Sequence, residues 1–301
     1  VDNNNRIFDS VRGASSKLIP DGTHAREIGD EFTSFDSDGF TLKGGTGANS
    51  SGNNFVSWNW KAGGTASSNT DGTITSSVSA NTDAGFSIVS YTGTGSAATI
   101  GHGLSTAPEL IIVKSLTGEG WNVYAEPVSS DPATDYLTLH TTNELKDDDR
   151  FWNDTVPSAS VFTVGSYDGT NKSADPLVAY CFHSVDGYSK VGKYEGNGDA
   201  DGPFLYTGFK PAYILLKTID DVNNWLIMDN KRIYGSTVSG NYNPVKADIK
   251  ANTTGGGSAY DTDFLSNGFK TRNTYGGQNE NGITYIYLAF AEAPLKYSRG
   301  R

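Results

Sequence analysis

Short apolar runs separated by turn dipeptides dominate the chain. Runs such as "GFSIVSYTG" (85–93), "ELIIVK" (109–114) and "TYIYLAF" (284–290) have the length of β-strands and are rich in β-branched and aromatic residues. Asp-Gly and Asn-Gly pairs stand between such runs and accept the positive φ angles of two-residue hairpins. The pattern predicts an all-β protein of antiparallel sheets, in which alternating strands such as 284–290 are half-buried in a two-layer sandwich.

The same pattern occurs more than once along the chain. The run "PELIIVK" (108–114) returns as "PAYILLK" (211–217), and "PLVAYCF" (176–182) returns as "TYIYLAF". Near the start, "RIFDSVR" (6–12) aligns without gaps on "LIMDNKR" (226–232), which lies in the middle of the last copy. The sequence therefore predicts tandem antiparallel β-sandwich repeats, of which the first is incomplete because its opening strands would lie upstream of residue 1.

The repeats set the expected domain boundaries. Residues 1–64 are the C-terminal half of a first β repeat, 85–187 a second repeat, and 188–301 a third repeat with a C-terminal tail. Residues 65–84 are a Gly/Ser/Thr-rich connector or hairpin, and alternation in "GTITSSVSA" favours the hairpin. Half a sandwich cannot bury its own apolar face, so residues 1–64 should lean on an upstream segment, a neighbouring repeat or another copy.

The alignment of the repeats also predicts which residues form equivalent cores. The two complete repeats should bury matching aliphatic positions in their central strands and matching phenylalanines in two others. These positions are Ile111, Val113, Phe162, Phe182, Ile214, Leu216, Phe269 and Phe290.

Charge and composition exclude several classes of function. The 34 acidic and 23 basic residues give a net charge of −11, which repels phosphate backbones and anionic membrane surfaces, so we expect no nucleic-acid partner. No stretch approaches 18 apolar residues, so we expect no membrane insertion. The single cysteine, Cys181, precludes a disulfide within the chain and a cysteine-built zinc site, and its apolar run favours a buried structural role.

No motif predicts catalysis, a metal or a cofactor. A G-x-S-x-G elbow is absent from the sequence, and the four histidines stand in unrelated contexts. The loop "GNGDADG" (196–202) resembles a calcium loop through Asn197, Asp199 and Asp201. However, Gly208 stands where the bidentate glutamate belongs, and no helix is expected on either side. We therefore interpret it as an acidic hairpin loop.

Longer phrases carry a resemblance to a known family. The stretches "FDSVRGAS", "TSFDSDGFTL", "NNFVSWNWKAGG", "GHGLSTAPELIIVK" and "YIYLAFAEAP" are similar to a repeated β-rich module of bacteriophage tail-fibre and other virion structural proteins, often found beside concanavalin-A/laminin-G-like domains. The resemblance covers essentially the whole chain. It implies a structural protein located in the virion, in a tail fibre or similar appendage, and not an enzyme, because the module brings no catalytic residues with it.

Three functions are consistent with these observations. The first is an adhesive appendage protein that positions or forms a binding region for host cell-surface glycan. The second is a capsid or fibre decoration protein without receptor binding, and the third is a polysaccharide depolymerase. The repeat-equivalent Trp121 and Trp225 are best explained as core anchors. Trp152, Tyr242 and Tyr275 have no repeat equivalents and are the candidate carbohydrate contacts.

Partners follow from the same reasoning. Other virion proteins are expected neighbours of an appendage component. The incomplete first repeat leaves unpaired strand edges, which predicts a homo-oligomer with residues 1–84 in the contact and a trimer as the expected assembly. The alternative is a monomer whose first repeat is completed by its own upstream sequence.

Overall fold

The computed structural model describes residues 4–232, 244–245, 248–250 and 261–293. Antiparallel strands make up nearly all regular structure in these residues, so the predicted all-β class is confirmed. A single helical turn, α1 (Asp168–Asn171), is the only α-helix among them. None of the described residues belongs to a helix that could cross a bilayer.

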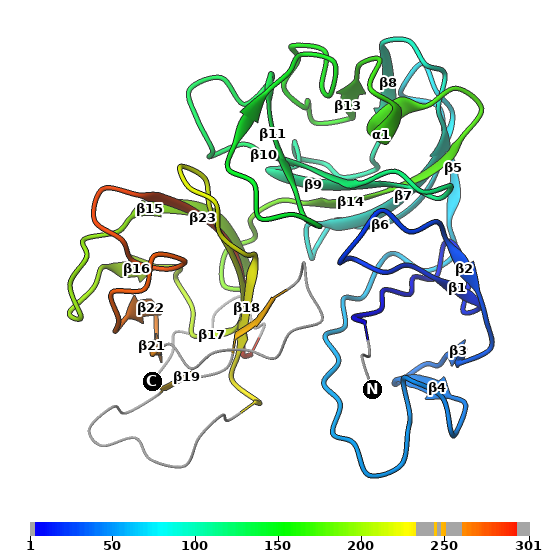
Figure 1. Cartoon of the computed structure of the whole chain (residues 1–301). Coiled ribbons are helices and arrows are strands. Elements are labelled where there is room, and N and C mark those ends of the chain that lie inside the picture. Colours follow the sequence, from blue (N-terminus) through cyan, green and yellow to red (C-terminus); the bar gives the residue numbers. More distant parts are fainter. Residues whose placement is uncertain (1–3, 233–243, 246–247, 251–260, 294–301) are drawn as a thin grey trace.

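The first sandwich is built on an eight-stranded sheet (Figure 1). In sheet order its strands are β12 (Lys146–Asp147), β11 (Asp135–Thr138), β10 (Trp121–Ala125), β9 (Leu110–Ser115), β14 (Pro176–Phe182), β7 (Phe86–Thr92), β6 (Ser76–Asn81) and β5 (Ser67–Asn69). One face of this sheet is covered by the pair β8 (Ala98–Gly101) and β13 (Val161–Val164). The β5–β6 hairpin places the Gly/Ser/Thr-rich stretch at the edge of the sheet beside β7.

The second sandwich uses the same strand order. Its main sheet contains β15 (Ser189–Glu195), β23 (Thr284–Ala291), β17 (Pro211–Thr218), β18 (Leu226–Asp229) and β20 (Asp248–Lys250). The facing sheet contains β16 (Phe204–Tyr206), β22 (Gly268–Thr271), β21 (Thr262–Leu265) and β19 (Pro244–Val245). In each main sheet the last strand of the segment lies between the first and third strands. In each facing layer the second strand of the segment pairs with a later strand, β8 with β13 and β16 with β22.

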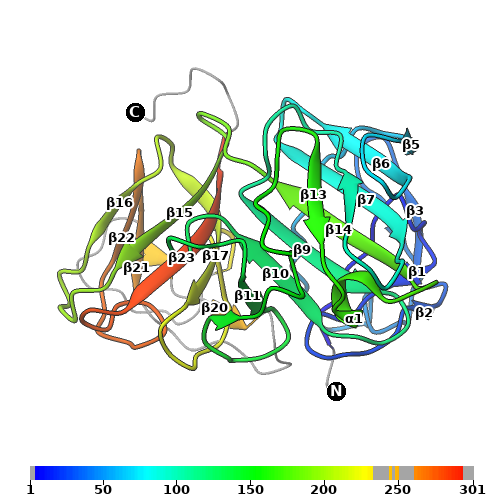
Figure 2. The ribbon, with the colours of Figure 1, turned by 90° about the horizontal axis from the view of Figure 1, so that it is seen from above.

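Three apolar clusters hold the molecule together. Two lie inside the sandwiches, one around Ile111 and Phe162 and the other around Ile214 and Phe269. The third lies between them, where the outer faces of the two main sheets meet, and we call it the central cluster. Figure 2 shows the two sandwiches side by side with these sheets adjacent. The sandwiches are thereby joined by a shared core.

The core positions expected from the repeats are buried, with one correction. Ile111, Val113, Ile214, Leu216, Phe162 and Phe269 lie in the two inner cores as predicted. Phe182 and Phe290 are also buried, but they belong to the central cluster, 6.1 Å apart between ring centroids. The strands that carry them are buried on both faces and not half-buried as the sequence suggested, because a second sheet covers each outer face.

The N-terminal segment lies along the outer faces of both main sheets (Figure 1). It contains two small hairpins, β1 (Ser16–Lys17) with β2 (Glu27–Ile28), and β3 (Phe32–Phe35) with β4 (Phe40–Leu42). Trp58 and Trp60 both pack edge-on against Tyr213 of the second sandwich, with ring centroids 5.7 and 5.3 Å away. Leu18 is fully buried in the central cluster. Part of this segment therefore leans on the neighbouring sandwiches, one of the three supports expected for it.

Candidate functional site

A groove opens at the β10–β11 end of the first sandwich, with a cavity volume of about 270 Å³. Its floor comes from β10, β11 and the turn before β10, and Tyr167 contributes from the residue before α1. The remaining wall comes from the stretch after β11 and from the N-terminal segment. The lining residues are Thr23, Glu119, Gly120, Asn122, Tyr136, Thr138, His140, Thr141, Asn143, Glu144, Lys146 and Tyr167.

Two tyrosines of the groove are held by one phenylalanine. Phe151 stacks on Tyr136 with ring centroids 3.6 Å apart and on Tyr167 at 4.0 Å. Two rings this close cannot share one face of Phe151, so Phe151 is the middle of a three-ring stack. Partial burial raises the pKa of Tyr136 and of Tyr167. Both hydroxyls are therefore protonated at neutral pH and can donate as well as accept hydrogen bonds.

His140 contributes a neutral imidazole to the groove. The backbone N–H of Trp121 donates to Nδ1 of His140 at 3.1 Å, so the ring proton lies on Nε2. Burial and, secondarily, the charge of Lys114 lower the pKa of His140, which keeps the ring uncharged near pH 7. Gly120 leaves room for the ring, because a Cβ atom there would lie 2.4 Å from Cε1 of His140.

The charged residues of the groove are paired. Glu144 Oε1 lies 2.6 Å from Lys146 Nζ, and Glu119 Oε1 lies 3.4 Å from Lys172 Nζ. The lining therefore presents hydroxyl, amide, imidazole and phenol groups with little net charge. Such a surface suits an uncharged ligand rich in hydroxyl groups more than an anion or a cation.

Two buried lysines fix the loops that surround the groove. Lys114 Nζ donates to the carbonyl oxygen of Glu119 and lies 5.9 Å from the ring centroid of Trp121. Its counterpart Lys217, in the second sandwich, donates to the carbonyl oxygens of Thr142 at 3.3 Å and Asp221 at 3.5 Å. Burial lowers the pKa of each lysine to about 8. Through Lys217 the second sandwich holds one wall of a groove in the first.

The other walls are held by similar long-range contacts. The N–H of Leu145 donates to the carbonyl oxygen of Ile219 at 2.9 Å, which again joins the two sandwiches. On the opposite side, Trp121 Nε1 donates to the carbonyl oxygen of Ile19 at 3.0 Å. The groove is thus assembled from the N-terminal segment and from parts held by both sandwiches.

The two lysines give a testable pH dependence. Their pKa is about 8 in the folded chain and near 10.5 in the unfolded chain, so the unfolded state binds more protons between these values. We expect the free energy of unfolding to rise from pH 8 toward pH 9.5, with each lysine contributing at most about 1.4 kcal/mol per pH unit. Above that range, ionisation of tyrosines on unfolding opposes the gain.

Urea unfolding at half-unit pH steps measures this slope. Lys114→Met should remove about half of it, whereas Lys146→Met, which changes a half-exposed lysine, should leave it unchanged. Equal slopes in the parent chain and in Lys114→Met would show that Lys114 does not titrate in this range.

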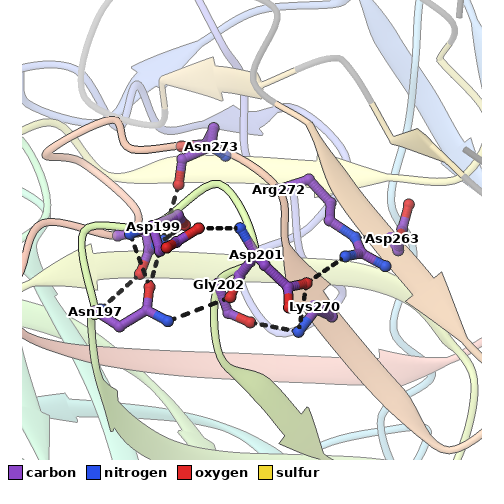
Figure 3. Close-up of polar contacts among 9 residues, drawn as sticks. Asn197, Asp199, Asp201, Gly202, Asp263, Lys270, Arg272 and Asn273 are labelled. Atoms are coloured by element: carbon purple, nitrogen blue, oxygen red, sulfur yellow. Dashed lines mark hydrogen bonds and ion pairs between the residues drawn. The ribbon is translucent and has the colours of Figure 1, made fainter. Parts of the chain in front are cut away.

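The Asp-rich loop between β15 and β16 is satisfied by protein donors (Figure 3). Asp201 Oδ1 lies 2.7 Å from the Arg272 guanidinium and 3.1 Å from Lys270 Nζ. Asp199 Oδ1 accepts from the N–H of Asp201 at 2.8 Å, and Asn197 Oδ1 accepts from that of Asp199 at 3.0 Å. Bonding to Lys270 lowers the pKa of Asp201. The loop is therefore an ion-paired connection from the main sheet to the facing sheet. The expectation of a hairpin loop is wrong, because β15 pairs with β23 and β16 pairs with β22 in the opposite sheet.

Among the described residues, no group of three or more His, Cys, Asp or Glu side chains could hold a metal ion. Cys181 lies in the inner core of the first sandwich, and burial raises its pKa to about 12. It is a packing residue in this position.

The two candidate carbohydrate contacts that the structure describes, Trp152 and Tyr275, lie in different sandwiches. Trp152 is only 1% exposed, and its Nε1 donates to the carbonyl oxygen of Asp135 at 3.1 Å, so the expectation of an exposed ring is wrong. Tyr275 is half-buried at the edge of the second inner core, and its hydroxyl lies 3.5 Å from Oδ1 of Asn223. Tyr242 lies outside the described residues. Neither Trp152 nor Tyr275 is among the lining residues of the groove.

The groove residues carry no local sequence signal. Tyr136 and His140 stand in "TDYLTLH" (134–140), which indicates only a strand, and Tyr167 stands in a turn. Trp121 and Trp225 are buried, as expected of core anchors, but they belong to the central cluster and not to the inner cores.

The fold and groove define an all-β protein with two fused sandwiches and a polar, tyrosine-lined recess. The chain matches, over residues 1–294, the model of a family described as a domain of unknown function, DUF7483, and it belongs to that family. No curated protein and no solved structure gives a significant match.

Proposed function

We propose that this protein is a bacteriophage virion structural protein, a component of a tail fibre or similar appendage, and that its groove binds an uncharged host-surface glycan. The observation that supports the binding proposal is the lining of the groove. It contains two tyrosines that stack on Phe151, a neutral histidine, and amide and hydroxyl groups, and its carboxylates are paired with lysines. Sugars are bound by such combinations of aromatic rings and directional polar groups. The resemblance of the phrases quoted above to the phage module supports the virion placement.

Glycan binding is tested with the whole chain on a glycan array that includes host polysaccharide, followed by calorimetry. Tyr136→Phe with Tyr167→Phe keeps the ring stack and removes two hydroxyl groups, and should weaken binding by about tenfold. Tyr206→Phe, on an exposed tyrosine of β16 outside the groove, is the matched control and should bind as the parent chain does. The proposal is contradicted if the parent chain binds no glycan on the array. It is also contradicted if the parent chain, the double variant and the control variant bind equally well.

Two alternatives are separated by further measurements. Glu119 and Glu144 both line the groove, so a depolymerase is tested by incubating the chain with host polysaccharide and assaying for new reducing ends. Antibody labelling of intact particles tests the virion placement: label at fibre tips supports an appendage, and label over the capsid supports a decoration protein. Particles without label contradict a virion role.

We also propose that copies associate in the particle as a homo-oligomer, with three as the expected number. Light scattering at micromolar concentration measures this directly, and a monomer across the range contradicts it. A contact that is biological should bury more than about 1,000 Å² in total.

A further inference from the structure

The N-terminal segment reproduces local contacts of the second sandwich. Asp9 Oδ1 accepts from the N–H groups of Val11 and Arg12 at 3.1 and 2.8 Å. Asp229 Oδ1 accepts from the two corresponding N–H groups, both at 2.9 Å. In each case the arginine guanidinium pairs with the other carboxylate oxygen and also donates to the carbonyl oxygen five residues earlier. Residues 6–12 and 226–232 therefore have the same local structure.

The strand pairing of the N-terminal segment also matches that of the second sandwich. Ile7 bridges Leu18 in the antiparallel sense, as Ile227 pairs with Ile249 between β18 and β20. In the hairpin of β3 and β4, Phe35 faces Phe40, just as Phe264 faces Phe269 between β21 and β22. Residues 55–61 occupy the sequence position of β23, and Trp60 contacts Phe290 in the central cluster.

The side chains that would form an inner core in this segment are open to solvent. In the second sandwich, Phe264, Phe269 and Tyr285 are at most 1% exposed. Of their counterparts, Phe35 is 43% exposed, Phe55 is 50% exposed, and Phe40 is half-buried. An apolar aromatic face in the N-terminal segment thus lacks the cover that the second sandwich provides.

The second sandwich shows what that cover is. There β17 lies between β23 and β18 and sends Ile214 and Leu216 into the inner core. Within the described residues, 55–61 form no strand ladder, and the stretch 6–9 that corresponds to β18 makes only the bridge between Ile7 and Leu18. The strand missing from this arrangement is the one equivalent to β17.

We propose that the aromatic face of residues 6–61 is an acceptor for a β segment with the residue pattern of β15 to β17, whose last strand inserts between residues 6–9 and 55–61. The inserted strand would present alternating aliphatic side chains to Phe35, Phe40 and Phe55 and would pair through its backbone on both edges. In the second sandwich β17 connects directly to β18, so a segment of the same topology enters ahead of Arg6. This inference does not depend on the proposed glycan binding or virion location.

The test supplies the segment in its expected register. A copy of residues 188–225 is placed directly before Arg6, so that the added β17 precedes residues 6–9 as it precedes β18, and residues 6–301 are retained. Hydrogen exchange is then compared with that of the unmodified chain. We expect amide exchange in residues 32–42 and 55–61 to slow by at least about tenfold, because exposed extended backbone becomes paired. Binding of a hydrophobic dye to the chain should fall as the aromatic face is covered.

A matched control carries Ile214→Asp and Leu216→Asp in the added copy alone. Those charges cannot enter an apolar core, so this protein should exchange at the rates of the unmodified chain. Unchanged exchange in both fusions, or equal slowing in both, overturns the proposal. The proposal is also overturned if amide exchange in residues 32–42 and 55–61 of the unmodified chain slows as the protein concentration rises. The segment that covers the aromatic face would then belong to a second copy.

Discussion

Phe269→Ala is expected to lower the free energy of unfolding by about 3–5 kcal/mol, because the ring is fully buried and its removal leaves a large cavity. Phe269 packs edge-on against Tyr287 with ring centroids 5.2 Å apart, and Tyr194 lies 6.2 Å away in the same inner core. Rings of this size cannot relax far enough to fill the space left behind. Urea unfolding followed by tryptophan fluorescence measures the change.

Its counterpart in the N-terminal segment is the natural control. Phe40 holds the same position in its hairpin but is half-buried, so Phe40→Ala should lower the stability by no more than about 1 kcal/mol. A loss as large as that of Phe269→Ala would mean that Phe40 is covered in solution. A loss below about 1 kcal/mol for Phe269 itself would show that β22 does not face a packed core.

Asp9→Asn is expected to destabilise the chain by about 3–5 kcal/mol, because it leaves a buried guanidinium without its counter-ion. The side chains of Arg12 and Asp9 are only 2% and 3% exposed. Tyr180 of β14 donates its hydroxyl to Asp9 Oδ2 at 2.7 Å, so the pair also joins the N-terminal segment to the first sandwich. Thermal and urea unfolding should both report the loss.

The equivalent pair in the second sandwich provides the comparison. Arg232 is 17% exposed and lies 5.4 Å from the ring centroid of Trp58, so Asp229→Asn should have a smaller effect because water can solvate the freed charge. Tyr180→Phe removes two hydrogen bonds, one donated to Asp9 and one accepted from Arg12 at 3.3 Å, and should lower the stability by about 1–3 kcal/mol. If Asp9→Asn were no more harmful than Asp229→Asn, burial of Arg12 would not be the determining factor.

The sequence predicted the inner architecture because that information is local or repeated. Alternation along the strands and the echo between "PELIIVK" and "PAYILLK" were enough to place Ile111 and Ile214 in equivalent cores. Alternation also separates the two faces of a strand, but it does not say what covers the outer one. For that reason the sequence predicts equivalent cores of two repeats for Phe182 and Phe290, whereas both face the one central cluster that the two sandwiches share.

The groove could not have been predicted from sequence. Thr23, Tyr136 and Tyr167 come from distant parts of the chain, and backbone contacts between the two sandwiches hold one wall. Trp152 is a candidate contact in the sequence because it has no repeat equivalent, and the polar run "KDDDR" (146–150) that precedes it gives no sign of burial. This polar run ends at the exposed Arg150, and the next residue, Phe151, is buried. The chain therefore passes from solvent into the core between two consecutive residues.

The central cluster has a mechanical consequence. Two domains on a flexible linker bend at the linker when force is applied, whereas two sheets packed face to face resist bending across their whole contact area. Phe182, Phe290 and Trp60 place aromatic rings from the two sandwiches and the N-terminal segment in one packed layer. A pull exerted at the groove would therefore be transmitted through this layer as a shear load shared by many side chains. We expect the two sandwiches to yield together under tension, in a single rupture event.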